Sequence, residues 1–121
     1  MGPVEISQRT IGGVTILALA GEFDAFHLPV ASGAIEQLIH RGSTRLVLNL
    51  REMRFITSAP LGYLLETAHL VKELGGELVI SDPSEHFRNT TKTLGIDQIF
   101  RIFPNEDEAV SSLLRDSTDS S

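Results

Sequence analysis

Hydrophobic and polar residues follow two different spacings that take turns along the chain. In some segments apolar residues alternate with polar ones or form short aliphatic runs, which predicts β-strands. These segments are residues 4–10, 14–23, 44–50 and 77–82, with a short last one at 98–103. Elsewhere apolar residues recur every three or four positions, which predicts helices. The helical segments begin near 26 or 27, 59, 84 and 105 and end near 42, 74, 95 and 116.

Turn residues and element order together predict how these elements pair. Gly12–Gly13 favours a tight hairpin, so the first two strands should be antiparallel. The later strands alternate with helices, which favours parallel pairing through right-handed crossovers. We therefore expect one α/β domain over residues 1–116, a mixed five-stranded sheet packed with about four helices. The first strand should lie at a sheet edge, and residues 117–121 should form a disordered tail.

Composition and charge narrow the possible functions. The 121 residues are 41% hydrophobic and 21% charged, as in ordinary globular domains. The net charge of −6 disfavours nucleic acid and anionic membrane surfaces as partners. No apolar run approaches the roughly 18 residues of a membrane span, and no signal-peptide pattern opens the chain. We therefore expect a cytoplasmic protein without membrane insertion. The absence of cysteine excludes disulfides and thiolate chemistry.

Motifs for catalysis and nucleotide binding are missing from the sequence. Neither G-x-x-x-x-G-K-[ST] nor G-x-G-x-x-G occurs. Ser58 lies between an apolar run and a helix, as a hydrolase nucleophile does, but it lacks the flanking glycines of G-x-S-x-G. The histidines, which are His27, His40, His69 and His86, have no metal-ligand spacing. We expect no enzymatic activity, no cofactor and no metal site, and an enzyme or nucleotide-binding domain is the least favoured hypothesis.

The stretch MRFITSAPLGYLLETAHLV, residues 53–71, contains the hydroxyl of greatest interest. Ser58 stands where a helix begins, and Pro60 in the first turn strengthens this signal. One interpretation is structural, because a serine that caps a helix contributes about 1 kcal/mol. The other is functional, because a helix start beyond the carboxyl end of a strand suits partners and phosphate. Phosphorylation there would add about −1.5 to −2 charges and change partner binding without unfolding the helix.

Several segments, taken in order, resemble one known family. LALAGEFDAFHLP contains a strand that ends in Gly-x-hydrophobic-Asp before the first helix. The segment LVLNLREMRFITSAPLGYLLETAHLVKELGGELVISD adds an aliphatic strand, a loop serine, a Leu-Gly, a long helix and a Gly-Gly turn. A Leu-Gly-hydrophobic-Asp at 94–97 and a final acidic helix complete the succession. From about Val4 to Leu114 the chain resembles the STAS domain (sulfate transporter and anti-sigma factor antagonist), in particular the free-standing anti-sigma factor antagonists.

This resemblance implies regulation by binding, without catalysis. Unphosphorylated antagonists of the family bind an anti-sigma factor that is also a serine kinase, and the sigma factor is released. Phosphorylation of a loop serine breaks that complex, and a PP2C-type phosphatase restores it. The matching positions imply Ser58 as the phosphoacceptor, with Thr57 as second choice. They imply partner-binding roles for Asp24, Thr57, Ser58, Leu61 and Gly62. Asp24 is explained equally well as a cap of the first helix.

The loop around Ser58 departs from the family pattern. The family usually reads Asp-Ser-Ser/Thr-Gly-Leu-Gly, whereas this chain reads Thr-Ser-Ala-Pro-Leu-Gly at 57–62. The carboxylate before the acceptor is therefore missing, and Pro60 replaces the first glycine. These changes favour an alternative function, a constitutive STAS scaffold that is not phosphorylated, or an accessory subunit of a signalling or transporter complex.

The expected contact face surrounds the region of Ser58 and Asp24. We expect it to comprise Thr57–Leu65, the Asp24–Leu28 turn and the exposed side of the long helix through His69 and Lys72. The acidic charge of the chain would steer this face toward a basic patch on its partner. An exposed edge strand at 4–10 would also permit a homodimer.

Overall fold

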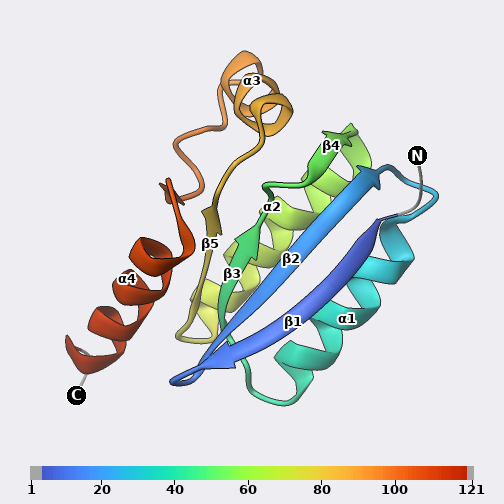
Figure 1. Cartoon of the computed structure of the whole chain (residues 1–121). Coiled ribbons are helices and arrows are strands. Elements are labelled where there is room, and N and C mark those ends of the chain that lie inside the picture. The colour runs from blue at the N-terminus through green and yellow to red at the C-terminus, as the bar shows by residue number, and fades with distance from the viewer. Residues whose placement is uncertain (1–3, 120–121) are drawn as a thin grey trace.

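The computed structural model describes residues 4–119, with side chains as far as Leu114, and shows a twisted mixed sheet with helices on both faces (Figure 1). The strands are β1 (Glu5–Ile11), β2 (Val14–Phe23), β3 (Arg45–Asn49), β4 (Met53–Ile56), β5 (Glu77–Ser81) and β6 (Ile102–Phe103). The helices are α1 (Leu28–His40), α2 (Ser58–Glu73), α3 (Glu85–Thr93) and α4 (Glu106–Asp119). The predicted α/β class is confirmed.

The strand order in the sheet is β1-β2-β3-β5-β6, and β4 pairs with β2. The hairpin of β1 and β2 is antiparallel, whereas β2, β3, β5 and β6 pair in parallel. Gly12 and Gly13 close the hairpin with φ of +54° and +87°, backbone angles that glycine adopts without strain. The predicted hairpin, the parallel pairing and the edge position of β1 are all confirmed.

The predicted count of five strands is wrong, because residues 4–119 form a sheet of six. The missed strand is β4, which spans only four residues and includes the exposed Arg54 between buried Met53 and Ile56. It forms because β2 is longer than β3. Residues 15–18 of β2 pair with β3, and residues 21–23 pair with β4, with a register shift between Gly21 and Glu22. A strand this short has no periodicity to detect, and only the tertiary pairing reveals it.

The C-terminal helix is longer than the sequence predicted. Helix α4 continues to Asp119, although a disordered tail was expected from residue 117. No glycine or proline stands between residues 114 and 119, so the local sequence contains no stop signal for the helix. Residues 120–121, the end of the expected tail, lie outside the described part of the chain.

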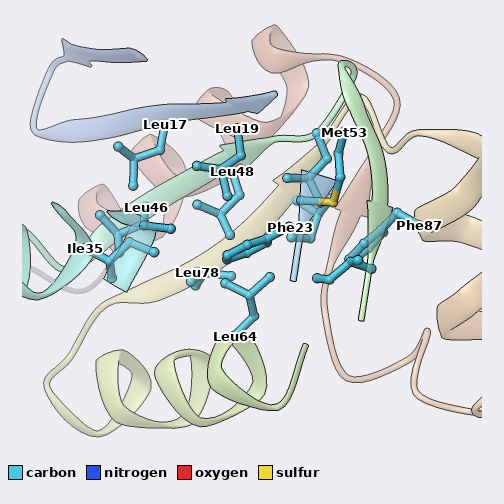
Figure 2. Packing of buried hydrophobic residues seen from close by; sticks show 14 of the residues in the cluster. Leu17, Leu19, Phe23, Ile35, Leu46, Leu48, Met53, Leu64, Leu78 and Phe87 are labelled. Atoms are coloured by element: carbon cyan, nitrogen blue, oxygen red, sulfur yellow. The ribbon is translucent and has the colours of Figure 1, made fainter. Parts of the chain in front are cut away.

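Two hydrophobic clusters occupy the two faces of the sheet. The larger one lies between the sheet and α1, α2 and α3, and Figure 2 shows Ile35, Leu64 and Phe87 pointing from these helices toward the strands. The smaller one lies under α4 and includes Val14, Ile16, Val47, Val79 and Leu113. The central strands are buried on both faces, which explains their continuous aliphatic runs. Burial of this apolar surface is the main force that holds the helices on the sheet.

Gly75 and Gly76 connect α2 to β5 for two different reasons. Gly75 has φ of +90°, which places it in the left-handed region that favours glycine. Gly76 has ordinary φ, but a Cβ atom at this position would lie 2.0 Å from the backbone oxygen of Thr44. The chain therefore needs one glycine for its conformation and one for a close backbone approach.

Candidate functional site

The carboxyl ends of β2 and β4 bring together the two segments that contain the predicted site residues, the turn at Asp24 and the start of α2. Phe23, at the end of β2, is paired with Ile56, at the end of β4. The backbone N–H of Thr57 donates to the carbonyl oxygen of Phe23 over 3.0 Å. The turn that begins at Asp24 and the start of α2 at Ser58 are consequently neighbours at the carboxyl ends of these two strands.

The hydroxyl of Ser58 does not cap α2. Thr57 occupies the N-cap position with an extended backbone, and its side chain makes no capping hydrogen bond. Ser58 is the first residue of the helix, and both residues are exposed. Ser84 at the start of α3 shows what a cap looks like here, because its Oγ accepts the N–H of Phe87 over 3.2 Å. The capping interpretation of Ser58 is therefore wrong.

The backbone at the start of α2 offers few donors to an anion. The first hydrogen bond within the helix runs from the Leu61 N–H to the Thr57 carbonyl oxygen, over 3.2 Å. Among the residues before Leu61, Ser58 and Ala59 have N–H groups without a partner inside the helix. Pro60 is buried in the third position and has no N–H. A phosphate at this helix start would therefore find two helical N–H donors instead of three.

Asp24 organises the turn that faces Ser58. Its Oδ1 accepts the backbone N–H of His27 over 2.9 Å and lies 2.7 Å from the Nδ1 of the same residue. The donation from the His27 backbone lowers the pKa of Asp24 below its usual range. Helix α1 begins only at Leu28, with His27 as its N-cap residue. Asp24 therefore caps the turn before α1, and this turn directly follows Phe23, whose carbonyl oxygen accepts the N–H of Thr57.

The two remaining expected contact residues, Leu61 and Gly62, differ in how far they are buried. The side chain of Leu61 is 3% exposed and packs in the larger hydrophobic cluster. It anchors the helix start from inside, so its side chain does not face a partner. Gly62 is half-buried, and a Cβ atom at this position would meet nothing within 4 Å. Gly62 therefore stays a candidate contact residue.

Sequence reasoning did not single out two aromatic side chains near this site. Phe26 follows Asp24 closely and is 84% exposed, with its ring edge-on to that of His27 at a centroid distance of 5.1 Å. His86 comes from α3, and its Nε2 lies 3.4 Å from the carbonyl oxygen of Ile56 and 3.1 Å from the Oγ1 of Thr90. The apolar Phe26 was visible in the sequence but its exposure was not, and nothing in the sequence placed His86 behind the loop.

The exposed side of α2 carries a shallow groove farther from Ser58. Leu65, Ala68, His69 and Lys72 line it together with Ile99 from the segment after α3, and its volume is about 310 Å³. His69 also pairs with Glu73, with 3.2 Å between Nε2 and the carboxylate. His69 and Lys72 are therefore both accessible, as the predicted contact face requires.

Among the described side chains, which end at Leu114, no three acidic or histidine residues converge in a way that could hold a metal ion. No helix in this part of the chain is both long and apolar enough to cross a membrane.

Comparison with known proteins places the chain in a family. Residues 5–109 match the STAS domain, which is most of the chain. The chain belongs to the STAS domain family. The anti-sigma F factor antagonist of Paenibacillus polymyxa is 28% identical over 111 residues, which cover 91% of this chain and 95% of that protein. The resemblance stated from the sequence is thus confirmed.

Solved structures support the same fold. The Thermotoga maritima protein TM1081 superposes with a TM-score of 0.83 at 18% identity, over 89% of this chain and 93% of that one. The phosphorylated form of SpoIIAA, a cell fate determinant of Bacillus, gives a TM-score of 0.71 at 19% identity, over 89% and 98% of the two chains. At these identities the likeness concerns the STAS fold alone.

Proposed function

We propose that this STAS protein is an anti-sigma factor antagonist whose partner binding is controlled by phosphorylation of Ser58. The relative from Paenibacillus polymyxa, an anti-sigma F factor antagonist, supports the first half of the proposal. The phosphorylated SpoIIAA structure shows that a protein of this fold carries the modification. The protein would act in the cytoplasm by binding an anti-sigma factor that is also a serine kinase, and it would catalyse nothing itself. A PP2C-type phosphatase would reverse the modification.

The observation that carries the proposal is the state of the Ser58 side chain. Ser58 is exposed at the first position of α2, and its hydroxyl has no hydrogen-bond partner in the part of the chain with described side chains, residues 4–114. A kinase can therefore reach it without breaking a bond of the fold. Thr57 is also exposed and its side chain makes no capping hydrogen bond, so it remains the second choice as acceptor.

A phosphate on Ser58 would change the surface strongly and the fold weakly. It would add about −1.5 to −2 charges at the positive end of the α2 dipole, where negative charge is tolerated or slightly stabilising. The same charge would lie beside the turn that presents the Asp24 carboxylate. A partner that covers this edge would have to desolvate two neighbouring anions. A cost of about 3 kcal/mol would weaken binding by roughly a hundredfold.

The proposed contact face combines the Asp24 turn with the start and exposed side of α2. Phe26 supplies its largest apolar group, and exposed Val30 continues the apolar surface onto the first turn of α1. Buried aromatic anchors surrounded by polar groups carry most of the binding energy in protein interfaces. We therefore assign Phe26 as the anchor and Asp24 with Ser58 as the polar, switchable part. His69 and Lys72 would lie at the rim.

Intact-mass analysis with phosphopeptide mapping tests this function on protein isolated from its native cells, in growth and under stress. The expected result is one species heavier by about 80 Da, modified on Ser58, whose fraction changes with the condition. Cells that carry Ser58→Ala should show no such species, and cells that carry Thr57→Ala should keep it. Protein that stays unmodified in every condition would contradict the switch.

A constitutive scaffold is the second candidate function, and one observation favours it. Pro60 is buried in the first turn of α2, where it stiffens the loop and removes an N–H that could bind the phosphate. Such a scaffold could serve a signalling or transporter complex without ever being phosphorylated. It predicts partner binding that is the same for Ser58→Ala and Ser58→Asp variants, whereas the switch predicts loss of binding only for Ser58→Asp.

A further inference from the structure

Strand β1 forms an open edge of the sheet. It is last in the strand order, and it pairs only with β2. Figure 1 shows it as the outermost strand on this side of the sheet, with α1 drawn next to it, and no further strand of residues 4–119 pairs with it. Natural proteins protect such edges with short strands, prolines, lysines or bulges. Strand β6 at the opposite edge is protected because it has two residues, whereas β1 has seven residues, unbroken register, no proline and no lysine.

The hairpin determines which backbone groups of β1 face outward. The two-residue Gly12–Gly13 turn places Ile11 opposite Val14, a pair that is hydrogen-bonded in such a turn. Bonded and non-bonded pairs alternate along an antiparallel ladder. Every second residue of β1 counted back from Ile11, which means Arg9, Ser7 and Glu5, therefore forms its backbone hydrogen bonds with β2. Ile6, Gln8 and Thr10 direct their N–H and carbonyl groups away from the sheet.

A second copy of β1 can pair with this edge in a small number of antiparallel registers. Residues whose backbone groups point outward must lie opposite such residues of the other copy. A two-fold axis at Ser7 meets this condition, because it places Ile6 opposite Gln8 of the other copy. The same axis places Glu5 opposite Arg9 twice, once on each side. An axis at Gln8 would instead place Arg9 opposite Ser7, and an axis at Arg9 would bring the two arginines together. Only the axis at Ser7 pairs opposite charges.

The two charged side chains are available for this pairing. Glu5 is exposed and forms no ion pair with any described side chain of residues 4–114. Arg9 is exposed and contacts the carboxylate of Glu106 through one terminal nitrogen. A guanidinium has five N–H donors, so Arg9 can bind Glu106 and a second carboxylate together. Opposed charges in a non-hydrogen-bonded pair lie close enough to attract each other.

We propose that the chain forms a symmetric homodimer in which two β1 strands pair antiparallel about Ser7, with Glu5 of each copy opposite Arg9 of the other. The two sheets then continue as one. This surface is separate from the edge that carries Ser58, because Ser58 lies beyond the far side of β2, after β4. The dimer would therefore present two switch sites at once. The interface is small, so the association should be weak and concentration-dependent.

Engineered cysteines test the register directly, because the chain has no cysteine of its own. In the proposed dimer two Ser7→Cys side chains face each other across the axis in a non-hydrogen-bonded pair. Their Cα atoms would be about 4.5 Å apart, within the range of a disulfide. Two Thr10→Cys side chains would be about 20 Å apart along the strands, so this variant is the matched control.

The expected result, with oxidised glutathione and about 50 µM protein, is cross-linking of Ser7→Cys at least tenfold faster than of Thr10→Cys. Adding Glu5→Arg to Ser7→Cys should slow the reaction several-fold at low salt, because arginines would then oppose each other. Sedimentation of the unaltered chain should show its mass rise from 13.2 kDa toward twice that value with concentration. Equal rates for the two cysteine variants, or a monomer at all concentrations up to about 1 mM, would overturn the proposal.

Discussion

Replacing Ser58 by alanine separates a structural from a regulatory hydroxyl, and Ser84 provides the matched comparison. Both serines stand at helix starts, and both changes remove one hydroxyl. Ser84 accepts the N–H of Phe87 over 3.2 Å, and that N–H is partly buried. Ser58 accepts nothing and is exposed. The Ser84→Ala change should cost about 1 kcal/mol of unfolding free energy, the usual value for loss of a cap. The Ser58→Ala change should stay within about 0.5 kcal/mol of the unaltered protein.

Urea unfolding followed by far-UV circular dichroism resolves this difference. With a slope of about 2 kcal/mol per molar, 1 kcal/mol moves the midpoint by about 0.5 M, and the melting temperature falls by about 4 °C. A Ser58→Asp variant adds a charge at the start of α2 and should be as stable as the unaltered protein or slightly more so. If Ser58→Ala loses as much stability as Ser84→Ala, the hydroxyl is structural. If Ser58→Asp loses more than about 1 kcal/mol, phosphorylation would act by unfolding and the proposed switch is refuted.

Three further predictions concern packing, binding and pH. Gly76→Ala should lower the free energy of unfolding in urea by about 2 kcal/mol or more, because its Cβ would clash with the Thr44 backbone. Gly33→Ala, at an exposed position of α1, should raise it by about 0.5–1 kcal/mol, and equal effects of the two changes would contradict the packing argument. Phe26→Ala should weaken binding to the anti-sigma factor about 30-fold or more in calorimetry, with unchanged unfolding free energy, and unchanged affinity would remove Phe26 as the anchor. Burial raises the pKa of Glu106, but hydrogen bonds from Arg9 and Asn49 outweigh this effect and lower the pKa overall. Ionised Glu106 therefore stabilises the fold above about pH 4.5, and this contribution is lost as the pH falls further. Glu106→Gln should therefore lose less stability than the unaltered protein between pH 6 and pH 3, and an identical pH dependence would show that the pair contributes nothing.

Much of the fold could be predicted because its signals are local. The helical spacing of α2 and the Gly-Gly that ends it stand in consecutive residues, and the aliphatic runs of β3 and β5 mark strands buried on both faces. Strand β4 could not be predicted, because it is short, contains Arg54 and exists through its pairing with the long β2. The extension of α4 could not be predicted from composition, because the polar residues 117–119 are typical of a tail, yet residues 114–119 contain no glycine or proline that would stop the helix.

The candidate site was predictable in its location and not in its details. The family resemblance and the helix-start signal both selected the region of Ser58 and Asp24, and the pairing of β2 with β4 brings these residues together. Whether Thr57 or Ser58 is the N-cap residue depends on where α2 begins to within one residue, and the sequence pattern does not define a helix start that closely. The burial of Leu61 could have been read from the inner stripe of α2, whereas the exposure of Phe26 depends on how the turn before α1 folds back. His86 reaches the site from α3 only through tertiary packing.

The most direct test of the proposed function is the affinity of two forms of this protein for its partner. Each anti-sigma factor kinase encoded by the source organism would be purified and titrated with unmodified protein and with protein phosphorylated at Ser58. We predict tight binding of the unmodified form to one of them and binding at least about a hundredfold weaker for the phosphorylated form. Equal affinity of the two forms would contradict the switch, and no binding by either form would contradict the antagonist function itself.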